Sequence, residues 1–127
     1  MKTIIAGSRD IADYEALCQA IEGAPFGVTH FISGGARGVD SMAERYAKEN
    51  EMPITIFPAQ WSKHGRRAGP IRNSQMAAEA EALIALWDGE SRGTAHMIET
   101  MKKQNKATHV VILQSSGKVP LDDDILS

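Results

Sequence analysis

The chain has 127 residues, 43% of them hydrophobic and 24% charged, which predicts a single domain over residues 1–127 that can bury a core. Its formal net charge of −2 argues against a general nucleic-acid coat or a membrane-surface binder, and its apolar runs are too short for a membrane span or signal peptide, so we expect a cytoplasmic protein. The single cysteine, Cys18, cannot form an internal disulfide, and no paired Cys and His spacing indicates a metal or cofactor site.

Strand-like and helix-like segments alternate from the N-terminus. The apolar run at residues 3–7 predicts a strand, and apolar residues at helical spacing over residues 11–21 predict a helix capped by Asp10. Residues 28–33 predict the second strand, and a second helix is expected to begin near Val39.

The second half of the chain repeats this alternation. A third strand at residues 54–57 is followed by a polar segment, 58–70, whose length indicates either a functional loop or a surface excursion. The remaining predicted elements are a helix at 71–80, a strand at 82–87, a helix from 93 to about 103, a strand at 109–113 and a polar tail from about 114. This order predicts an α/β three-layer sandwich with a parallel, Rossmann-like sheet of about five strands.

Three glycines, at positions 34, 35 and 38, connect the second strand to the second helix. Glycine lets the backbone approach a ligand closely, and a helix N-terminus presents N–H groups to it, so we expect an anion here, most often a phosphate. The spacing is neither a dinucleotide fingerprint nor a P-loop. The alternative is a tight connection whose glycines serve packing only.

The loops that follow parallel strands meet at one edge of the sheet, where open α/β sheets bind ligands. We expect a cationic edge, although any single basic residue has the alternative of a solvated surface charge. Seven of the fourteen Lys and Arg residues fall in these loops: Arg9, Arg37, Lys63, Arg66, Arg67, Arg72 and Arg92. The residues expected to contact a ligand are Gly7, Ser8, Arg9, Ser33, Gly34, Gly35, Arg37, Gly38, Asp40, Trp61, Arg72, Asn73, Met76, Asp88, Gly89, Gly93 and Thr94.

Several motifs resemble those of known families. The segment Ser33-Gly-Gly-Ala-Arg-Gly-Val-Asp40 resembles the Ser-Gly-x-Ala-x-Gly-Ile-Asp run of the DprA/Smf family, which takes part in DNA uptake. Arg72-Asn-x-x-Met76, the apolar strand after it and Gly93-Thr94 are similar to motifs of the "lonely guy" phosphoribohydrolases. Both families belong to the SLOG superfamily, and the chain looks most like its small single-domain YspA-like branch. The resemblance implies a Rossmann-like pocket for a nucleotide or nucleotide-derived ligand.

The chain departs from the phosphoribohydrolases at a catalytic position. Their catalytic arginine falls on Arg72, but their catalytic glutamate falls on Met97. Glu99 is turned from that position by about 200° around the helix. Asp88 and Glu90 are the remaining candidate carboxylates, for acid–base chemistry or for ribose hydroxyls, and Asp88 has the alternative of capping the next turn.

Three functions follow, in decreasing order of preference. The first is a nucleotide-ligand binding module that senses or sequesters, the second is a hydrolase of N-glycosidic bonds, and the third is a single-strand DNA binder. Acidic balance and few aromatic residues argue against the third, so nucleic acid is not an expected partner. Trp61 and Trp87 are candidates for stacking on a base, although Trp87 ends a core strand and more often such a residue serves packing. His96 is interpreted as an ordinary helix position. The ligand's identity and the oligomeric state, a homodimer included, stay open.

Overall fold

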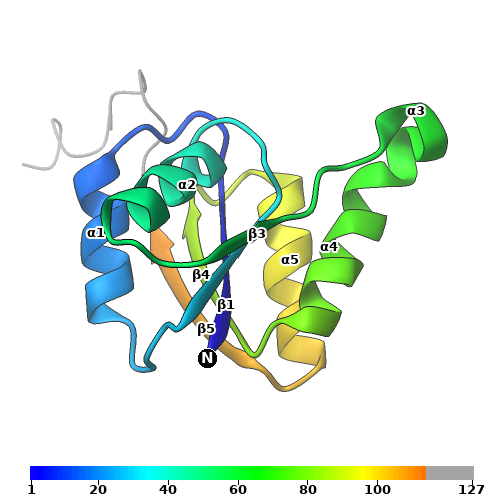
Figure 1. Cartoon of the computed structure of the whole chain (residues 1–127). Coiled ribbons are helices and arrows are strands. Elements are labelled where there is room, and N and C mark those ends of the chain that lie inside the picture. Colours follow the sequence, from blue (N-terminus) through cyan, green and yellow to red (C-terminus); the bar gives the residue numbers. More distant parts are fainter. Residues whose placement is uncertain (114–127) are drawn as a thin grey trace, which may run out of the picture.

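The structure, a computed structural model, describes residues 1–113, so the polar tail expected from about residue 114 lies outside the described residues. Five parallel strands form one sheet in the order β3-β2-β1-β4-β5 (Figure 1), with bounds β1 Lys2–Gly7, β2 His30–Ser33, β3 Ile54–Ile56, β4 Ala82–Trp87 and β5 Ala107–Ile112. In the register of the central strands, Ile4 of β1 lies opposite Ile32 of β2 and Leu83 of β4. This order is Rossmann-like, and the predicted parallel α/β sandwich is confirmed.

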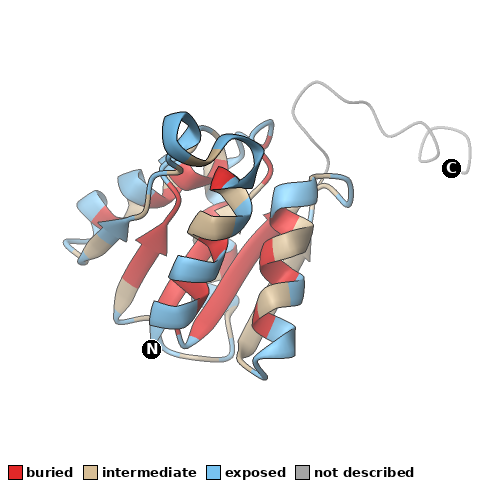
Figure 2. Ribbon diagram, turned by 90° about the vertical axis from the view of Figure 1, so that its right-hand side faces the viewer, coloured by how far each residue is buried: buried red, intermediate tan, exposed pale blue. Residues whose placement is uncertain are grey.

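Helices cover both faces of the sheet, as the crossover rule requires (Figure 1). One face carries α1 and α2, the other α4 and α5, with bounds α1 Tyr14–Gly23, α2 Val39–Glu49, α4 Ala68–Glu79 and α5 Arg92–Lys103. Side chains of β4 alternate between the two cores: Leu83 and Ala85 pack with α4 and α5, and Ile84 and Leu86 pack with α1 and α2. Figure 2 shows the result, with buried strands behind helices whose outer faces are exposed.

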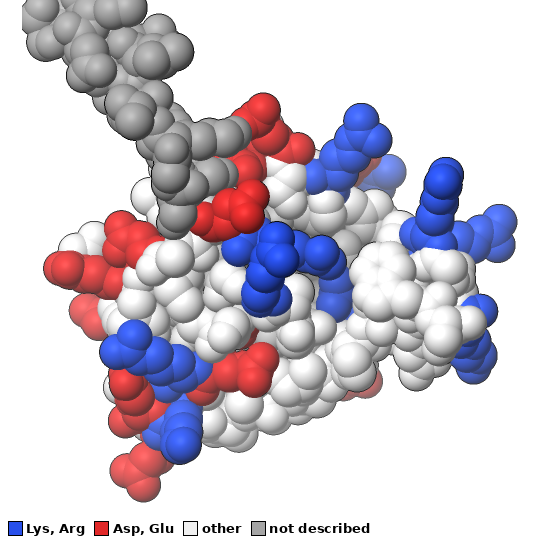
Figure 3. All heavy atoms as spheres, turned by 90° about the horizontal axis from the view of Figure 1, so that it is seen from above, with Lys and Arg blue, Asp and Glu red and all other residues white. Residues whose placement is uncertain are grey.

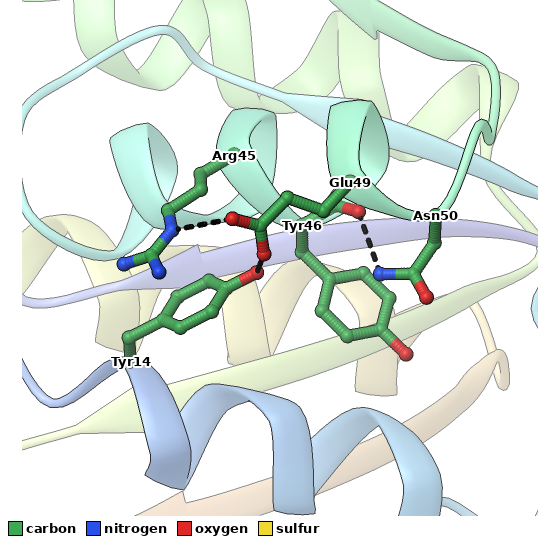
Figure 4. Close-up of polar contacts among 5 residues, drawn as sticks. All are labelled: Tyr14, Arg45, Tyr46, Glu49 and Asn50. Carbon is green, nitrogen blue, oxygen red and sulfur yellow. Dashed lines mark hydrogen bonds and ion pairs between the residues drawn. The ribbon is translucent and has the colours of Figure 1, made fainter.

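Polar contacts tie α1 to α2 at the surface (Figure 4). Glu49 accepts a hydrogen bond from the Tyr14 hydroxyl at 2.6 Å and another from Nε of Arg45 at 3.0 Å, and the Arg45 guanidinium lies 3.7 Å from the centre of the Tyr14 ring. Burial and the bond to Glu49 raise the pKa of Tyr14 above its ordinary value. At the end of α2, Nδ2 of Asn50 donates to the Tyr46 carbonyl at 2.9 Å. This cluster joins the two helices on the face opposite α4 and α5.

The predicted cap of the first helix is wrong by three residues. Asp13, not Asp10, caps α1, because its side chain accepts the N–H of Ala16 at 3.1 Å while its own backbone is extended. Ile11 precedes the helix and is buried in the core.

The segment at 58–70 is not the loop that its polar composition predicts. It contains the short helix α3 (Trp61–His64), the 3-10 helix η1 (Gly65–Arg67) and the first residues of α4, which begins at Ala68 rather than residue 71. Pro70 lies in the first turn of α4, where a missing N–H costs no helical hydrogen bond. In Figure 1, α3 projects from the end of α4 beyond the edge of the sheet. Within residues 1–113, none of the helices has the length and apolar character that a membrane span requires.

Candidate functional site

A cavity of about 800 Å³, the main cavity, lies at the carboxyl ends of β1 and β4. These strands are neighbours in the sheet, but the helices after them pack on opposite faces, so the cavity is at the switch point of the fold. The structure brings these predicted site residues together in its lining: Gly7, Ser8, Arg9, Arg37, Asp40, Trp61, Arg72, Asn73, Asp88, Glu90, Gly93 and Thr94.

A second cavity of about 350 Å³ adjoins the main cavity and shares Arg9, Ala36, Arg37, Trp61 and Arg72 with it. The predicted residues Gly34 and Gly35 line this second cavity. Four other predicted residues line neither cavity: Ser33, Gly38, Met76 and Gly89. Met76 lies one turn after Arg72 on α4 and is 2% exposed, because that turn faces the core rather than the edge of the sheet.

Of the seven basic residues predicted at this edge, four line the main cavity: Arg9, Arg37, Arg72 and Arg92. The other three, Lys63, Arg66 and Arg67, are exposed on α3 and η1. Figure 3 views this edge and shows Lys and Arg side chains at the centre of the face and on the projecting α3–η1 segment. The edge is cationic in part, since acidic side chains lie beside the central group (Figure 3).

Arg72 is held in place by three hydrogen bonds. Its Nη1 donates to the carbonyls of Gly34 at 2.7 Å and Phe57 at 3.4 Å, and its Nε donates to Oδ1 of Asn73 at 3.0 Å. Nη2 donates no hydrogen bond within residues 1–113. Because no buried side-chain nitrogen or oxygen of these residues lacks a partner, Nη2 has access to solvent. Burial lowers the pKa of Arg72, yet an arginine keeps its charge in proteins. One side of a fixed guanidinium therefore remains for a ligand.

The glycine loop supports Arg72, and two of its N–H groups are bonded within the protein. The N–H of Gly35 donates to Oγ of Ser33 at 3.2 Å, and the N–H of Ala36 donates to Oδ2 of Asp40 at 3.1 Å. A Cβ at Gly34 would lie 2.7 Å from Cζ of Arg72, so only glycine lets this guanidinium reach the loop. Contrary to expectation, the N–H groups of Gly35 and Ala36 are already used inside the protein.

Asp40 is a buried carboxylate in the main cavity. It lies in the first turn of α2, is 7% exposed and lines the cavity together with Arg72. Burial raises its pKa, and the hydrogen bond from Ala36 together with the charges of Arg72 and Arg9 oppose that rise. The charge of Asp40 is thus partly balanced by the two arginines.

Asp40→Asn is expected to gain stability over the wild type as pH rises from about 4 to 7. Because the pKa of Asp40 is raised in the native state, the unfolded state loses its proton first, and native stability falls as pH increases between the two pKa values. Asparagine keeps an oxygen that can accept the Ala36 N–H and has no charge to bury. Urea unfolding of both proteins across this range measures the difference in free energy. A difference independent of pH would contradict the assignment.

The N-terminus of α5 opens into the main cavity. Oγ of Ser91 caps the helix by accepting the N–H of Thr94 at 3.4 Å, while the first-turn N–H groups of Arg92 and Gly93 have no hydrogen-bond partner within residues 1–113. Ser91, Arg92, Gly93 and Thr94 all line the cavity. A helix N-terminus with unpaired N–H groups favours an anion at this position.

The loop before α5 is fixed by Asp88 and Trp87. Oδ1 of Asp88 accepts the N–H groups of Glu90 and Ser91, both at 2.8 Å, so Asp88 caps this turn while it lines the cavity. Nε1 of Trp87 donates to the Ser91 carbonyl at 3.0 Å, and the ring packs against the core. Trp87 lines neither cavity, whereas Trp61 lines both and is 52% exposed.

His96 belongs to the site, although the sequence indicated only a helix position. Oδ1 of Asn73 accepts from Arg72, and its Nδ2 donates to the Gly93 carbonyl at 3.3 Å, which fixes the orientation of the amide. The same Nδ2 lies 3.2 Å from Nδ1 of His96, so Nδ1 accepts and the neutral ring carries its proton on Nε2. The signal in the sequence was the position of His96 three residues after Gly93, on the same helix face. Ala6 and Asp10 are further lining residues missed from the sequence, whereas Ala36, Gly69, Pro70 and Ser91 line the cavity from loops expected at this edge.

Met97 occupies the position at which the resemblance to the phosphoribohydrolases would place a glutamate. Met97 lines the main cavity and is 1% exposed. Glu99 is exposed on another face of α5 and pairs with Nζ of Lys103 at 3.2 Å. Its orientation agrees with the rotation expected from the helical spacing.

Comparisons with known proteins agree with this architecture. Residues 1–64 match the model of the YspA, cpYpsA-related SLOG family. The Gene 61 protein of Mycobacterium phage D29 is 33% identical over 112 residues, which cover 80% of this chain and 89% of that protein. The X-ray structure of DNA processing protein A (DprA) from Streptococcus pneumoniae matches with a TM-score of 0.71 at 16% identity, over 91% of this chain. The match covers 52% of the DprA chain, so the likeness is one of fold with about half of a longer protein.

Proposed function

The chain belongs to the YspA, cpYpsA-related SLOG family, and on this basis we propose that it binds a nucleotide or nucleotide-derived ligand in the main cavity, as a sensing or sequestering module. The observation that carries the proposal is the position of Arg72. Its guanidinium is anchored on the protein side by Gly34, Phe57 and Asn73, and Nη2 remains accessible.

A phosphoryl group bound between Arg72 and the first turn of α5 would meet charge and backbone donors at once. Arginine provides charge-assisted hydrogen bonds, and the N–H groups of Arg92 and Gly93 add the helix N-terminus. The hydrogen bond from Asn73 to the Gly93 carbonyl couples the two donors, so both are fixed before the ligand arrives. Pre-organised donors lose little entropy on binding.

The rest of the main cavity suits a nucleoside. Asp88 and Glu90 line it and supply carboxylates for ribose hydroxyls, and His96 carries a proton on Nε2 that a base or sugar oxygen can accept. The exposed indole of Trp61 at the wall offers a stacking surface. The volume of the main cavity, about 800 Å³, is within the range of small-molecule sites.

Calorimetric titration with the four ribonucleoside monophosphates tests the proposal. At least one is expected to bind the wild type, and Arg72→Met is expected to weaken that binding by about tenfold to a hundredfold, because one charge-assisted contact contributes about 1.5–3 kcal/mol. Arg66→Met is the matched control, since Arg66 is exposed on η1 and lines neither cavity.

Two results would count against this function. One is the absence of binding for all four nucleotides, and the other is equal weakening in the Arg72 and Arg66 variants. A short single-stranded oligonucleotide in the same panel distinguishes nucleic-acid binding from nucleotide binding. Tight oligonucleotide binding that depends on Arg66 but not on Arg72 would place the ligand on the exposed basic segment instead.

Hydrolysis of an N-glycosidic bond is the second candidate, because Asp88 and Glu90 line the same cavity as Arg72. A carboxylate there could stabilise positive charge on the ribose or activate water. Asp88 is already committed in part, since its Oδ1 accepts two backbone N–H groups. We therefore rank binding above hydrolysis.

A further inference from the structure

The second cavity differs from the main cavity in its charge. Three arginines line it, Arg9, Arg37 and Arg72, and within residues 1–113 no Asp or Glu is among its lining residues. The main cavity, by contrast, includes four carboxylates: Asp10, Asp40, Asp88 and Glu90. The smaller cavity, of about 350 Å³, is thus the more cationic of the two.

The protein compensates the three guanidinium charges only in part, and the buried carboxylate of Asp40 interacts with two of them, Arg72 and Arg9. Burial lowers the pKa of Arg72, the charge of Asp40 opposes this, and the charge of Arg9 lowers the pKa further, so the like charges of Arg9 and Arg72 lie close enough to repel each other. Arg37 pairs with Oδ1 of Asp10 at 3.9 Å, and the two side chains are 76% and 69% exposed. Within residues 1–113, Arg9 forms no ion pair. An anion between these arginines would relieve the repulsion.

The walls of the second cavity suit an anionic group that is attached to a larger organic ligand. Gly34 and Gly35 line one part with backbone, and Gly35 has a φ of +73° and packs closely on Ile56 of β3. Pro58, Ala59 and Trp61 supply apolar surface for the rest. The N-terminus of α5 has no part in this cavity, because Arg92, Gly93 and Thr94 line only the main one.

We propose that the second cavity binds a second phosphoryl group, so that the ligand is a nucleotide with two separated phosphoryl groups, such as a nucleoside 3′,5′-bisphosphate or a dinucleotide. This inference rests on the proposed function, which assigns the first phosphoryl group to Arg72 and α5. Arg72 lines both cavities and therefore stands between the two groups. A monophosphate would leave the second cavity without an anion between its arginines.

Calorimetric titration with matched pairs of ligands tests the inference. The 5′-monophosphates and 3′,5′-bisphosphates of adenosine, guanosine, cytidine and uridine differ only in the second group. For the base that binds best, the bisphosphate is expected to bind at least about tenfold more tightly, as one further charge-assisted contact would give.

Ala59 provides a variant specific to the second cavity, because it lines that cavity and not the main one. Ala59→Glu places a carboxylate among the arginines, and Ala59→Gln is its control of equal size without charge. The Glu variant is expected to lose most of the difference in affinity between bisphosphate and monophosphate, and the Gln variant is expected to keep at least half of it on a logarithmic scale. In both variants the affinity for the monophosphate is expected to change by less than about threefold, because the added charge is farther from the first phosphoryl group.

The outcomes separate the two proposals. If neither ligand of any pair binds the wild type, the proposed function itself fails. If monophosphates bind but bisphosphates bind no better, the second phosphoryl group is wrong and the main site stands. An advantage that survives unchanged in Ala59→Glu would also overturn the inference, because it would place the second group elsewhere.

Discussion

Incubation with AMP is expected to release no free adenine above the rate in buffer, because the resemblance to the phosphoribohydrolases puts Met97 at the position of their catalytic glutamate. Cleavage of the N-glycosidic bond builds positive charge on the ribose. A carboxylate at close range stabilises that charge or activates water, and a buried thioether does neither. Loss of such a group costs roughly a hundredfold to ten-thousandfold in rate, or about 3–5 kcal/mol. Chromatography of the free base over several hours measures the rate.

Three variants locate any activity that is found. Met97→Glu is expected to be the only one in which turnover rises, although burying a carboxylate at a position that is 1% exposed will lower stability. Robust turnover in the wild type that disappears in Asp88→Asn or Glu90→Gln would contradict the prediction and establish a relocated carboxylate. A thermal unfolding curve for each variant separates loss of fold from loss of chemistry.

Gly34→Ala is expected to abolish most nucleotide binding although position 34 carries no functional side chain. The added methyl would lie 2.7 Å from Cζ of Arg72 and 3.0 Å from Oδ2 of Asp40. The guanidinium must therefore move and lose its hydrogen bond to the Gly34 carbonyl. We expect a loss of affinity close to that of Arg72→Met, about tenfold to a hundredfold. Overpacking at this position is also expected to cost about 1–3 kcal/mol of stability. Calorimetry and urea unfolding give the two values.

Gly23→Ala is the control for this substitution, because a Cβ at Gly23 meets no atom within 4 Å. It is expected to leave both affinity and stability nearly unchanged. If Gly34→Ala binds nucleotides as tightly as the wild type, Arg72 does not depend on the loop, and the role assigned to the glycines is wrong.

The architecture could be predicted from the sequence because its signals are local. Strands buried on both faces are apolar throughout, as at residues 82–87, and the helices between them show apolar residues at helical spacing. Parallel strands then fix which loops share an edge. Most residues expected at the site, from Gly7 to Thr94, therefore lie around one cavity.

The details of the site depend on contacts that no local pattern encodes. The bond from Arg72 to the Gly34 carbonyl joins residues 38 apart in the chain, and it changes the glycine loop from an expected cradle into a support. The contact between His96 and Asn73, which lies on another helix, fixes the ring of His96 and is not visible in the local sequence. The segment at 58–70 was misjudged because Pro70 and the charged residues before it indicate a loop, whereas a first helical turn accepts proline.

Phosphate binding between Arg72 and the first turn of α5 is tested most directly by NMR titration of the ¹⁵N-labelled protein with AMP. At 13.8 kDa the chain is suited to two-dimensional amide spectra. The largest shift changes are expected at the backbone N–H groups of Arg92 and Gly93 and at Nε–H of Arg72, with His30 and Lys106 unaffected at the opposite edge of the sheet. Saturating AMP that leaves Arg92 and Gly93 unchanged, or that shifts the opposite edge most, would contradict the proposed site.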